Sequence, residues 1–122
     1  MNPKYVLLTL AGTVLAVILL AVFLSKPAPA NPAKDEFAKC ITSKGFVMYG
    51  SATCSHCLKE KAAFGPAFQY VKYVECPANP ALCSAKNIEG FPTWEDSVNQ
   101  KLYPGEQGLI KLSQLSGCQL PQ

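Results

Sequence analysis

Two cysteines separated by two residues, Cys54–Cys57, constrain this chain more than any other feature. They follow a short apolar run at 45–50, GFVMYG, and precede a charged, helix-favouring stretch at 58–64. A strand, then Cys-x-x-Cys, then a helix is the context in which such a pair forms and breaks a disulfide reversibly. At a helix N-terminus, free backbone N–H groups and the positive end of the helix dipole lower the pKa of the first thiol. Because the thiolate attacks disulfides, the motif predicts a redox-active dithiol.

The N-terminal region differs in kind from the rest of the chain. Residues 5–24 carry no charge and are dominated by Val, Leu, Ile, Ala and Phe. As a helix they would extend about 30 Å, which matches the hydrocarbon core of a bilayer. We therefore expect residues 1–25 to form a single transmembrane anchor that contacts lipid through residues 5–24. Lys4 and the terminal amine favour a cytoplasmic N-terminus, which exports the remainder to the periplasmic or lumenal side of an inner or thylakoid membrane.

A cleaved signal peptide is the alternative interpretation of this segment. Ala28-Pro29-Ala30 has the small-residue pattern that signal peptidase recognises, but the apolar run is longer than a usual signal core. Both interpretations export the domain. Residues 26–34 are rich in Pro and Ala, which is typical of an extended linker, and residues 35–122 then form one small domain.

The charge pattern argues against one class of partner. The formal net charge of +3 is small and scattered over the 122 residues, and no basic stripe with interleaved aromatic residues is present. Nucleic-acid binding therefore has no support.

Six cysteines in so short a chain favour an oxidising compartment, where disulfides persist and stabilise small domains. Outside the motif four remain, and four cysteines allow three pairings. Cys76 and Cys83 flank a turn-rich segment, and we expect them to bond to each other as a structural disulfide, with a second redox pair as the alternative. Cys40 and Cys118 lie near the two ends of the domain. We expect a structural disulfide between them, which would close a long loop and stabilise the domain by about 4 kcal/mol in the chain-entropy model.

The remaining pattern predicts alternating helices and strands, and hence an α/β fold. Trp94 and Tyr103 are expected in the core or at its rim, and Lys59-Glu60-Lys61 is expected on a solvated helix face. The expected helices lie at 35–43, 57–70 with an interruption at Gly65-Pro66, 81–87 and 109–115, and the expected strands at 46–49, 70–75, 93–95 and 101–103.

This order, with Cys-x-x-Cys opening the helix after the first strand, resembles the thioredoxin-like fold, a central mixed sheet flanked by helices. The string Gly90-Phe91-Pro92-Thr93 strengthens the resemblance. Proteins of that fold place a cis-proline there, packed against the active-site disulfide, and the X–Pro bond is the one for which cis is cheap. The resemblance gives Pro92 this role. It also makes Phe91, together with Ser55 in the motif, an expected contact for a substrate peptide.

A closer resemblance rests on longer strings. They resemble the thioredoxin-like domain that is fused to, or works beside, bacterial and plant homologues of vitamin K epoxide reductase. In that family the domain passes disulfide equivalents between exported proteins and a membrane quinone reductase. The strings are MYGSATCSHC at 48–57, FG at 64–65, YVEC at 73–76, GFPTW at 90–94 and LYPG at 102–105.

The resemblance implies partners and cofactors for this chain. The expected partners are exported cysteine-containing proteins and a vitamin K epoxide reductase-like membrane protein. Because only one apolar span is present, we expect that membrane protein to be a separate chain. The redox-active disulfide is expected to need no cofactor of its own and no metal, with quinone acting only through the partner.

The motif also assigns roles to its members. Cys54 is expected to be the exposed nucleophile, and Cys57, one helical turn on, to resolve the mixed disulfide. His56, when protonated, would stabilise the Cys54 thiolate and make the couple more oxidising. Thioredoxins that act as reductants carry a buried aspartate on the preceding strand, and the matching position here is Met48. The sequence thus favours disulfide donation, with proton transfer to Cys57 by another route.

Two alternatives remain beside a membrane-anchored oxidant of exported thiols. The first is the same fold working in reverse, as a disulfide reductase or isomerase supplied with electrons from the membrane. The second is a non-enzymatic zinc module built on Cys54, His56 and Cys57 with a distant cysteine. Zinc sites usually present two closely spaced ligand pairs, whereas Cys76 and Cys83 have six residues between them.

Overall fold

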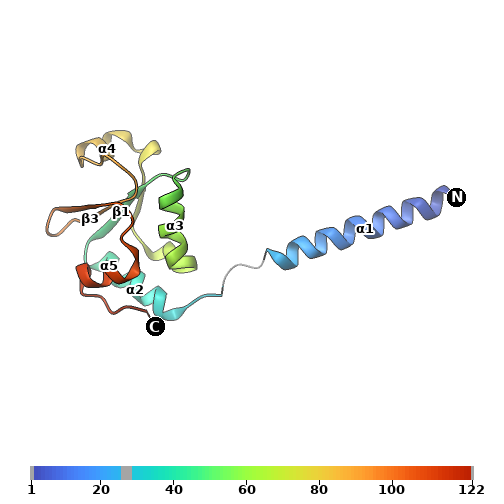
Figure 1. Cartoon of the computed structure of the whole chain (residues 1–122), viewed down its shortest axis with the longest axis horizontal. Coiled ribbons are helices and arrows are strands. Elements are labelled where there is room, and N and C mark those ends of the chain that lie inside the picture. The colour runs from blue at the N-terminus through green and yellow to red at the C-terminus, as the bar shows by residue number, and fades with distance from the viewer. Residues whose placement is uncertain (1, 26–28, 122) are drawn as a thin grey trace.

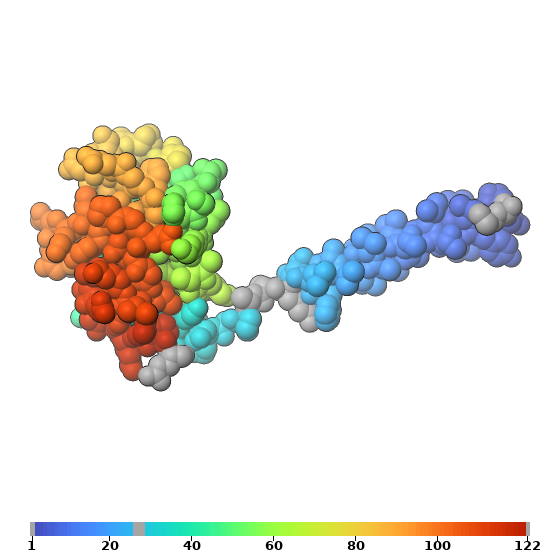
Figure 2. All heavy atoms as spheres, viewed as in Figure 1, coloured from blue at the N-terminus to red at the C-terminus, as the bar shows by residue number. Residues whose placement is uncertain are grey.

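The structure is a computed structural model that describes residues 2–25 and 29–121. Part of the expected linker, and Ala28 of the candidate cleavage motif, lie outside the described residues. Helix α1 spans Pro3–Leu24 and is long and apolar enough to cross a membrane, a test that an N-terminal signal sequence also passes. None of its described side chains is buried (Figure 2). The apolar helix expected from the sequence is therefore present.

Helix α2 spans Pro32–Ser43 and begins three residues before the expected start at Asp35. The Asn31 side chain caps it, because its Oδ1 accepts the N–H groups of Ala33 at 3.0 Å and Lys34 at 3.3 Å. Proline fits the first helical position, where no backbone N–H is needed. Pro32, which the sequence argument placed in the linker, thus helps to start the helix.

Four strands form one mixed sheet in the order β2-β1-β3-β4 (Figure 1). The central strand β1, Phe46–Gly50, pairs in parallel with β2, Tyr73–Glu75, and antiparallel with β3, Thr93–Asp96. Strand β4, Lys101–Pro104, completes a hairpin with β3. The parallel pair requires a crossover, which the helix after the Cys-x-x-Cys motif provides. The expected α/β, thioredoxin-like arrangement is confirmed.

The crossover has two parts. Helix α3 spans Ser55–Phe64, and a 3-10 helix, η1, continues over Gly65–Tyr70. This is the interruption expected at Gly65-Pro66, and Gly65 adopts a φ of +59° that favours glycine. Since Tyr70 belongs to η1, strand β2 is shorter than expected. The remaining elements are η2 at Cys76–Ala78, α4 at Pro80–Ala85 and α5 at Gly108–Ser116.

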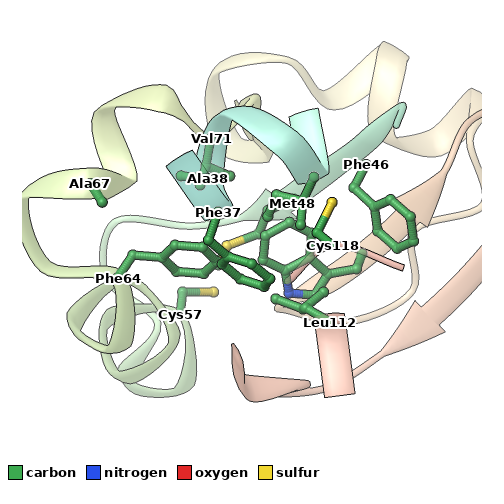
Figure 3. Packing of buried hydrophobic residues seen from close by; sticks show 12 residues of the cluster. Phe37, Ala38, Phe46, Met48, Cys57, Phe64, Ala67, Val71, Leu112 and Cys118 are labelled. Carbon is green, nitrogen blue, oxygen red and sulfur yellow. The ribbon is translucent and has the colours of Figure 1, made fainter. Parts of the chain in front are cut away.

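The core lies on both faces of the sheet, and alternate residues of β1 face opposite ways. Helices α2, α3 and α5 cover the larger cluster (Figure 3), and the smaller cluster lies beneath α4. Trp94 is fully buried and Tyr103 packs at the edge, as expected. The larger cluster contains Phe37, Ala38, Ile41, Phe46, Met48, Cys57, Phe64, Ala67, Val71, Trp94, Leu112 and Cys118, and the smaller contains Val47, Tyr49, Cys76 and Cys83.

Two disulfides join the expected pairs. Cys40 of α2 is bonded to Cys118 beyond α5, across a sequence separation of 78 residues. Cys76 is bonded to Cys83, which links η2 to α4 within the smaller cluster. Both bonds lie within the cores, and Cys54 and Cys57 remain as thiols. The two disulfides therefore stabilise the domain that carries Cys54 and Cys57.

Candidate active site

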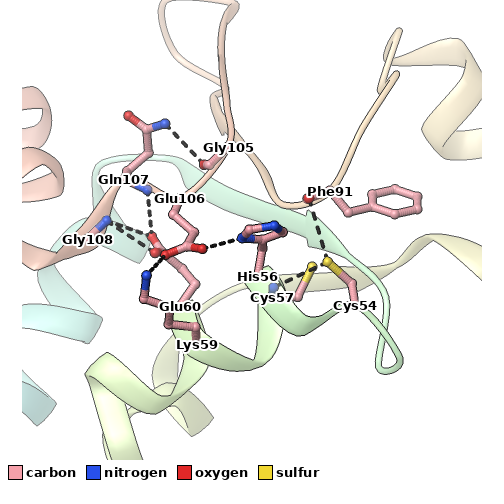
Figure 4. A network of polar contacts seen from close by, with 10 residues as sticks. All are labelled: Cys54, His56, Cys57, Lys59, Glu60, Phe91, Gly105, Glu106, Gln107 and Gly108. Carbon is pink, nitrogen blue, oxygen red and sulfur yellow. Dashed lines mark hydrogen bonds and ion pairs between the residues drawn. The ribbon is translucent and has the colours of Figure 1, made fainter.

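Cys54 and Cys57 lie at the N-terminus of α3, directly after the loop that leaves β1 (Figure 4). Cys54 is the N-cap residue of the helix, and its Sγ accepts the backbone N–H of Cys57 at 3.3 Å. It is partly exposed, whereas Cys57 is fully buried. One sulfur can therefore meet a substrate while the other is held behind it in the core.

The two thiols differ in acidity as well as exposure. The pKa of Cys54 is lowered, first by a hydrogen bond from the Cys57 thiol and then by the backbone N–H groups of Cys57 and His56. Burial, followed by the hydrogen bond with Cys54, raises the pKa of Cys57 to about 11. Because the thiolate is the nucleophilic form of a cysteine, Cys54 is the more reactive of the two sulfurs at neutral pH.

The loop before β3 borders the exposed sulfur. The backbone carbonyl of Phe91 lies 3.6 Å from Cys54 Sγ, and the Phe91–Pro92 peptide bond is cis. Pro92 is buried, and its carbonyl accepts the N–H of Gly105 at 2.7 Å, which ties this loop to the end of β4. Phe91 is 39% exposed, and Ser55 is also exposed. The two residues expected to contact substrate thus both present surface beside Cys54.

The imidazole of His56 contacts an acidic group that the sequence argument did not find. Its Nδ1 lies 2.5 Å from Glu106, in the loop before α5, and the same carboxylate binds Lys59 Nζ at 2.9 Å. Hydrogen bonds from His56 and then Lys59 lower the pKa of Glu106. The negative charge of Glu106, in contrast, raises the pKa of the Cys54 thiol. The His56 ring therefore contacts a carboxylate as well as lying beside the Cys54 thiol.

The expectation that the whole Lys59-Glu60-Lys61 segment is solvated was wrong for Glu60. Its side chain is 2% exposed and accepts Trp94 Nε1–H at 2.9 Å. It also accepts the backbone N–H groups of Gln107 at 3.2 Å and Gly108 at 3.0 Å, at the start of α5. A buried carboxylate is tolerated when N–H donors surround it, and a helix N-terminus is a favourable place for it. Glu60 thereby joins α3, β3 and α5.

The structure also bears on metal binding. The zinc alternative needs a further ligand from a distant cysteine, and the four cysteines outside the motif are bonded in pairs as Cys40–Cys118 and Cys76–Cys83. Among residues 2–25 and 29–121, no group of three or more His, Cys, Asp or Glu side chains is placed to hold a metal ion. The free thiols of Cys54 and Cys57 can carry out thiol–disulfide exchange.

Known proteins share sequence or structural similarity with this chain. The chain is 37% identical to "Thiol-disulfide oxidoreductase LTO1" of Arabidopsis thaliana over 102 residues, covering 76% of this chain and 27% of that protein. It thus spans about a quarter of the length of this relative. The solved structure of oxidized glutaredoxin 2 from Chlamydomonas reinhardtii matches 70% of this chain and 94% of that chain, with 24% identity and a TM-score of 0.37. No protein-family model matches the sequence.

Proposed function

We propose that this chain is a membrane-anchored thiol–disulfide oxidoreductase that oxidises the thiols of exported proteins. The observation that carries this proposal is the pairing of an exposed thiol of lowered pKa, Cys54, with a buried thiol of raised pKa, Cys57. The similarity to a protein named as a thiol-disulfide oxidoreductase supports the reaction class. A lowered pKa at the attacking cysteine stabilises the reduced form, which makes the couple more oxidising.

The reaction proceeds through two exchanges. A substrate thiolate attacks Cys54 Sγ of the disulfide, the Cys54–Cys57 bond breaks, and Cys57 leaves with the electron pair as a thiolate. A second substrate thiolate then attacks the substrate sulfur of the mixed disulfide and releases Cys54 as a thiolate. The substrate loses two electrons and gains a disulfide, and the pair becomes a dithiol. The lowered pKa of Cys54 makes it a good leaving group in the second exchange.

The substrate chain is proposed to lie along the loop before β3. The exposed Phe91 ring and the exposed Ser55 flank Cys54, and the Phe91 carbonyl points at its sulfur (Figure 4). Buried Pro92 holds this carbonyl in place through the packing of its ring. An extended peptide whose cysteine enters a mixed disulfide with Cys54 would then pass over Phe91. We assign His56 a tuning role, set by the balance between its own charge and that of Glu106.

The dithiol must be reoxidised, and we propose a quinone-linked, vitamin K epoxide reductase-like membrane protein for this step. The support is the resemblance of the motif strings, together with the apolar helix α1, which would confine the domain to the membrane surface. In this scheme Cys54 attacks a disulfide of the partner and Cys57 resolves the adduct. Two electrons then pass to the partner disulfide, and from it to quinone. The domain lies on the extracytoplasmic side, where its substrates emerge.

The reduction potential of the Cys54–Cys57 couple tests the direction of electron flow. The full chain in detergent is equilibrated against glutathione buffers, and the dithiol fraction is read by alkylation and mass spectrometry. A potential well above about −270 mV, toward about −120 to −180 mV, supports disulfide donation. A potential at or below about −270 mV would make the chain a reductase, with Glu106 as the group that favours that direction. Cys54→Ser, which cannot form the disulfide, gives the alkylation baseline.

The partner is tested by trapping. In Cys57→Ser, the resolving thiol is absent, so mixed disulfides on Cys54 should accumulate in the native membrane. The expected adducts are exported proteins and a multi-span membrane protein whose reoxidation depends on quinone. The double variant Cys54→Ser, Cys57→Ser is the matched control. Adducts with exported proteins alone would remove the membrane partner from the scheme and leave the oxidoreductase proposal intact.

A further inference from the structure

The buried Cys57 thiol must exchange a proton with solvent in each catalytic cycle. With a pKa of about 11, it is protonated at neutral pH, yet it must act as a thiolate when it resolves a mixed disulfide. When a substrate opens the disulfide, the same sulfur leaves as a thiolate and must be protonated again. Because Cys57 is fully buried behind Cys54, the proton needs a route through the protein.

Two polar residues of β2 lie on the same face of the sheet as this sulfur. In the parallel register of β1 and β2, Tyr73 lies opposite Met48 and Glu75 lies opposite Gly50. Residues paired in this way point to the same face of the sheet, which is the face that α3 covers. Met48 supplies no polar group to Cys57, so the first titratable side chain on this face comes from the neighbouring strand.

Gly50 leaves the space in which Tyr73 approaches the sulfur. A Cβ at this position would lie 2.9 Å from Cys57 Sγ, 3.2 Å from Tyr73 Cε2 and 3.5 Å from Tyr73 Oη. Any side chain here would displace either the sulfur or the phenol. The thiol and the hydroxyl therefore border the same gap beside the Gly50 backbone.

The hydroxyl of Tyr73 donates a hydrogen bond to Glu75 Oε2. The other oxygen, Oε1, accepts the backbone N–H of Ala52 at 2.9 Å in the loop before the motif, so the carboxylate is fixed at both ends. Glu75 is only partly buried, and it can pass a proton to water. We propose that Tyr73 and Glu75 form a relay that carries the Cys57 proton between the buried sulfur and solvent. This inference rests on the proposed function.

The pKa shifts of Tyr73 and Glu75 suit a proton relay. Burial and then the hydrogen bond to Glu75 raise the pKa of Tyr73, so the phenol passes its own proton to Glu75 only as it receives the thiol proton. The Tyr73 hydrogen bond, followed by that of Ala52, lowers the pKa of Glu75, so the carboxylate is ionised and able to accept. The titratable and charged groups that face the phenol are Glu75, the two cysteine thiols, and Lys61, whose Nζ lies 3.6 Å from the ring centroid.

The proton balance holds in both directions. During resolution, the Cys57 proton moves to Tyr73 Oη while the Tyr73 proton moves to Glu75, and the new Cys57 thiolate attacks Cys54 Sγ. The Cys54–Cys57 bond forms, and the partner sulfur leaves with the electron pair. During donation to a substrate, the same relay works in reverse and returns a proton to the Cys57 thiolate.

An aromatic disulfide reagent, 5,5′-dithiobis(2-nitrobenzoate), separates the two thiol steps in the full chain in detergent. Attack by Cys54 on the reagent releases one coloured thiolate, and resolution by Cys57 releases a second. Tyr73→Phe keeps the ring and removes the hydroxyl, and Glu75→Gln keeps the shape and removes the charge. We expect both to slow the second phase at neutral pH at least about tenfold, without changing the first. Tyr103→Phe, which removes a hydroxyl from β4, should leave both phases unchanged.

The pH profile adds a readout that a loss of packing would not produce. In Tyr73→Phe the second phase should rise about tenfold per pH unit across the neutral range, because it follows the small Cys57 thiolate fraction directly. In the wild type the rise should be shallower. A second phase in Tyr73→Phe that matches the wild type in rate and slope would overturn the relay, as would equal slowing of both phases. Absence of the second phase from the wild type would instead overturn the proposed function.

Discussion

The difference in pKa between Cys54 and Cys57 predicts a large difference in the rates at which they react. A thiol with a pKa of about 11 is ionised to only about one part in ten thousand at pH 7. A thiol whose pKa lies below 9.0 is ionised to at least about one part in a hundred. If only thiolate reacts, Cys54 should be alkylated at least about a hundredfold faster than Cys57 at pH 7. Burial of Cys57 adds to the difference.

Two variants of the full chain in detergent make the measurement. Cys57→Ser leaves Cys54 as the reactive thiol, and Cys54→Ser leaves Cys57, with the serine hydroxyl still able to hydrogen-bond the remaining sulfur. Iodoacetamide labelling is followed by mass spectrometry over a range of pH. The rate for Cys54 should level off below pH 9, whereas the rate for Cys57 should still rise about tenfold per pH unit up to about pH 11.

The shape of each profile separates acidity from access. Poor access lowers the rate of Cys57 by the same factor at every pH, while the pKa sets the pH at which the rate levels off. The reasoning is refuted if Cys57 levels off at or below the pH found for Cys54, even if it reacts more slowly. The roles of nucleophile and resolving thiol would then have to be exchanged.

Three further predictions concern the surroundings of Cys54 and Cys57. Glu60→Leu should lower the free energy of unfolding in urea by about 3–5 kcal/mol, because buried N–H groups lose their acceptor. Glu60→Gln should lower it by about 1–2 kcal/mol, and losses below about 1 kcal/mol in both variants would contradict the buried network. Glu106→Gln should speed alkylation of Cys54 at neutral pH, because the carboxylate raises the pKa of that thiol, and an unchanged or slower rate would show that its effect through His56 dominates. Replacing Cys40 and Cys118 by serine should lower the free energy of unfolding by about 4 kcal/mol and leave the alkylation rate of Cys54 unchanged. A much smaller loss would mean that this disulfide adds little to the stability of the domain.

Features of the site that depend on nearby residues could be predicted from the sequence. The Cys-x-x-Cys motif, the glycine-bounded strand before it and the helix after it are local patterns, and they place Cys54 at a helix N-terminus without knowledge of the fold. The break at Gly65-Pro66 is equally local. The Cys76–Cys83 bridge follows from a short turn between its ends. Helix α2 begins earlier than the sequence predicts, because Pro32 suits the first turn of a helix as well as a linker.

Contacts between distant segments could not be predicted in this way. Glu60 stands between two lysines, and its own neighbours give no sign that it is buried. Its partners, Trp94 and the start of α5, reach it only because the β3–β4 hairpin returns α5 to the side of α3. The contact of His56 with Glu106 depends on the same return, across 50 residues of sequence. A charge next to a motif in sequence is therefore a weaker guide to its electrostatics than a charge brought there by the fold.

The surroundings of Cys57 show why strand register matters to the chemistry. The strand before the motif carries Met48, not an acid, so the sequence indicates no proton route to Cys57. In the folded sheet, the residue beside Met48 on the parallel neighbour is Tyr73, and the residue beside Gly50 is Glu75. A shift of this register by one residue would turn both side chains to the opposite face, away from α3. The polar surroundings of the resolving thiol are thus set jointly by a missing side chain at Gly50 and by the pairing of β2, and neither signal is visible in the motif itself.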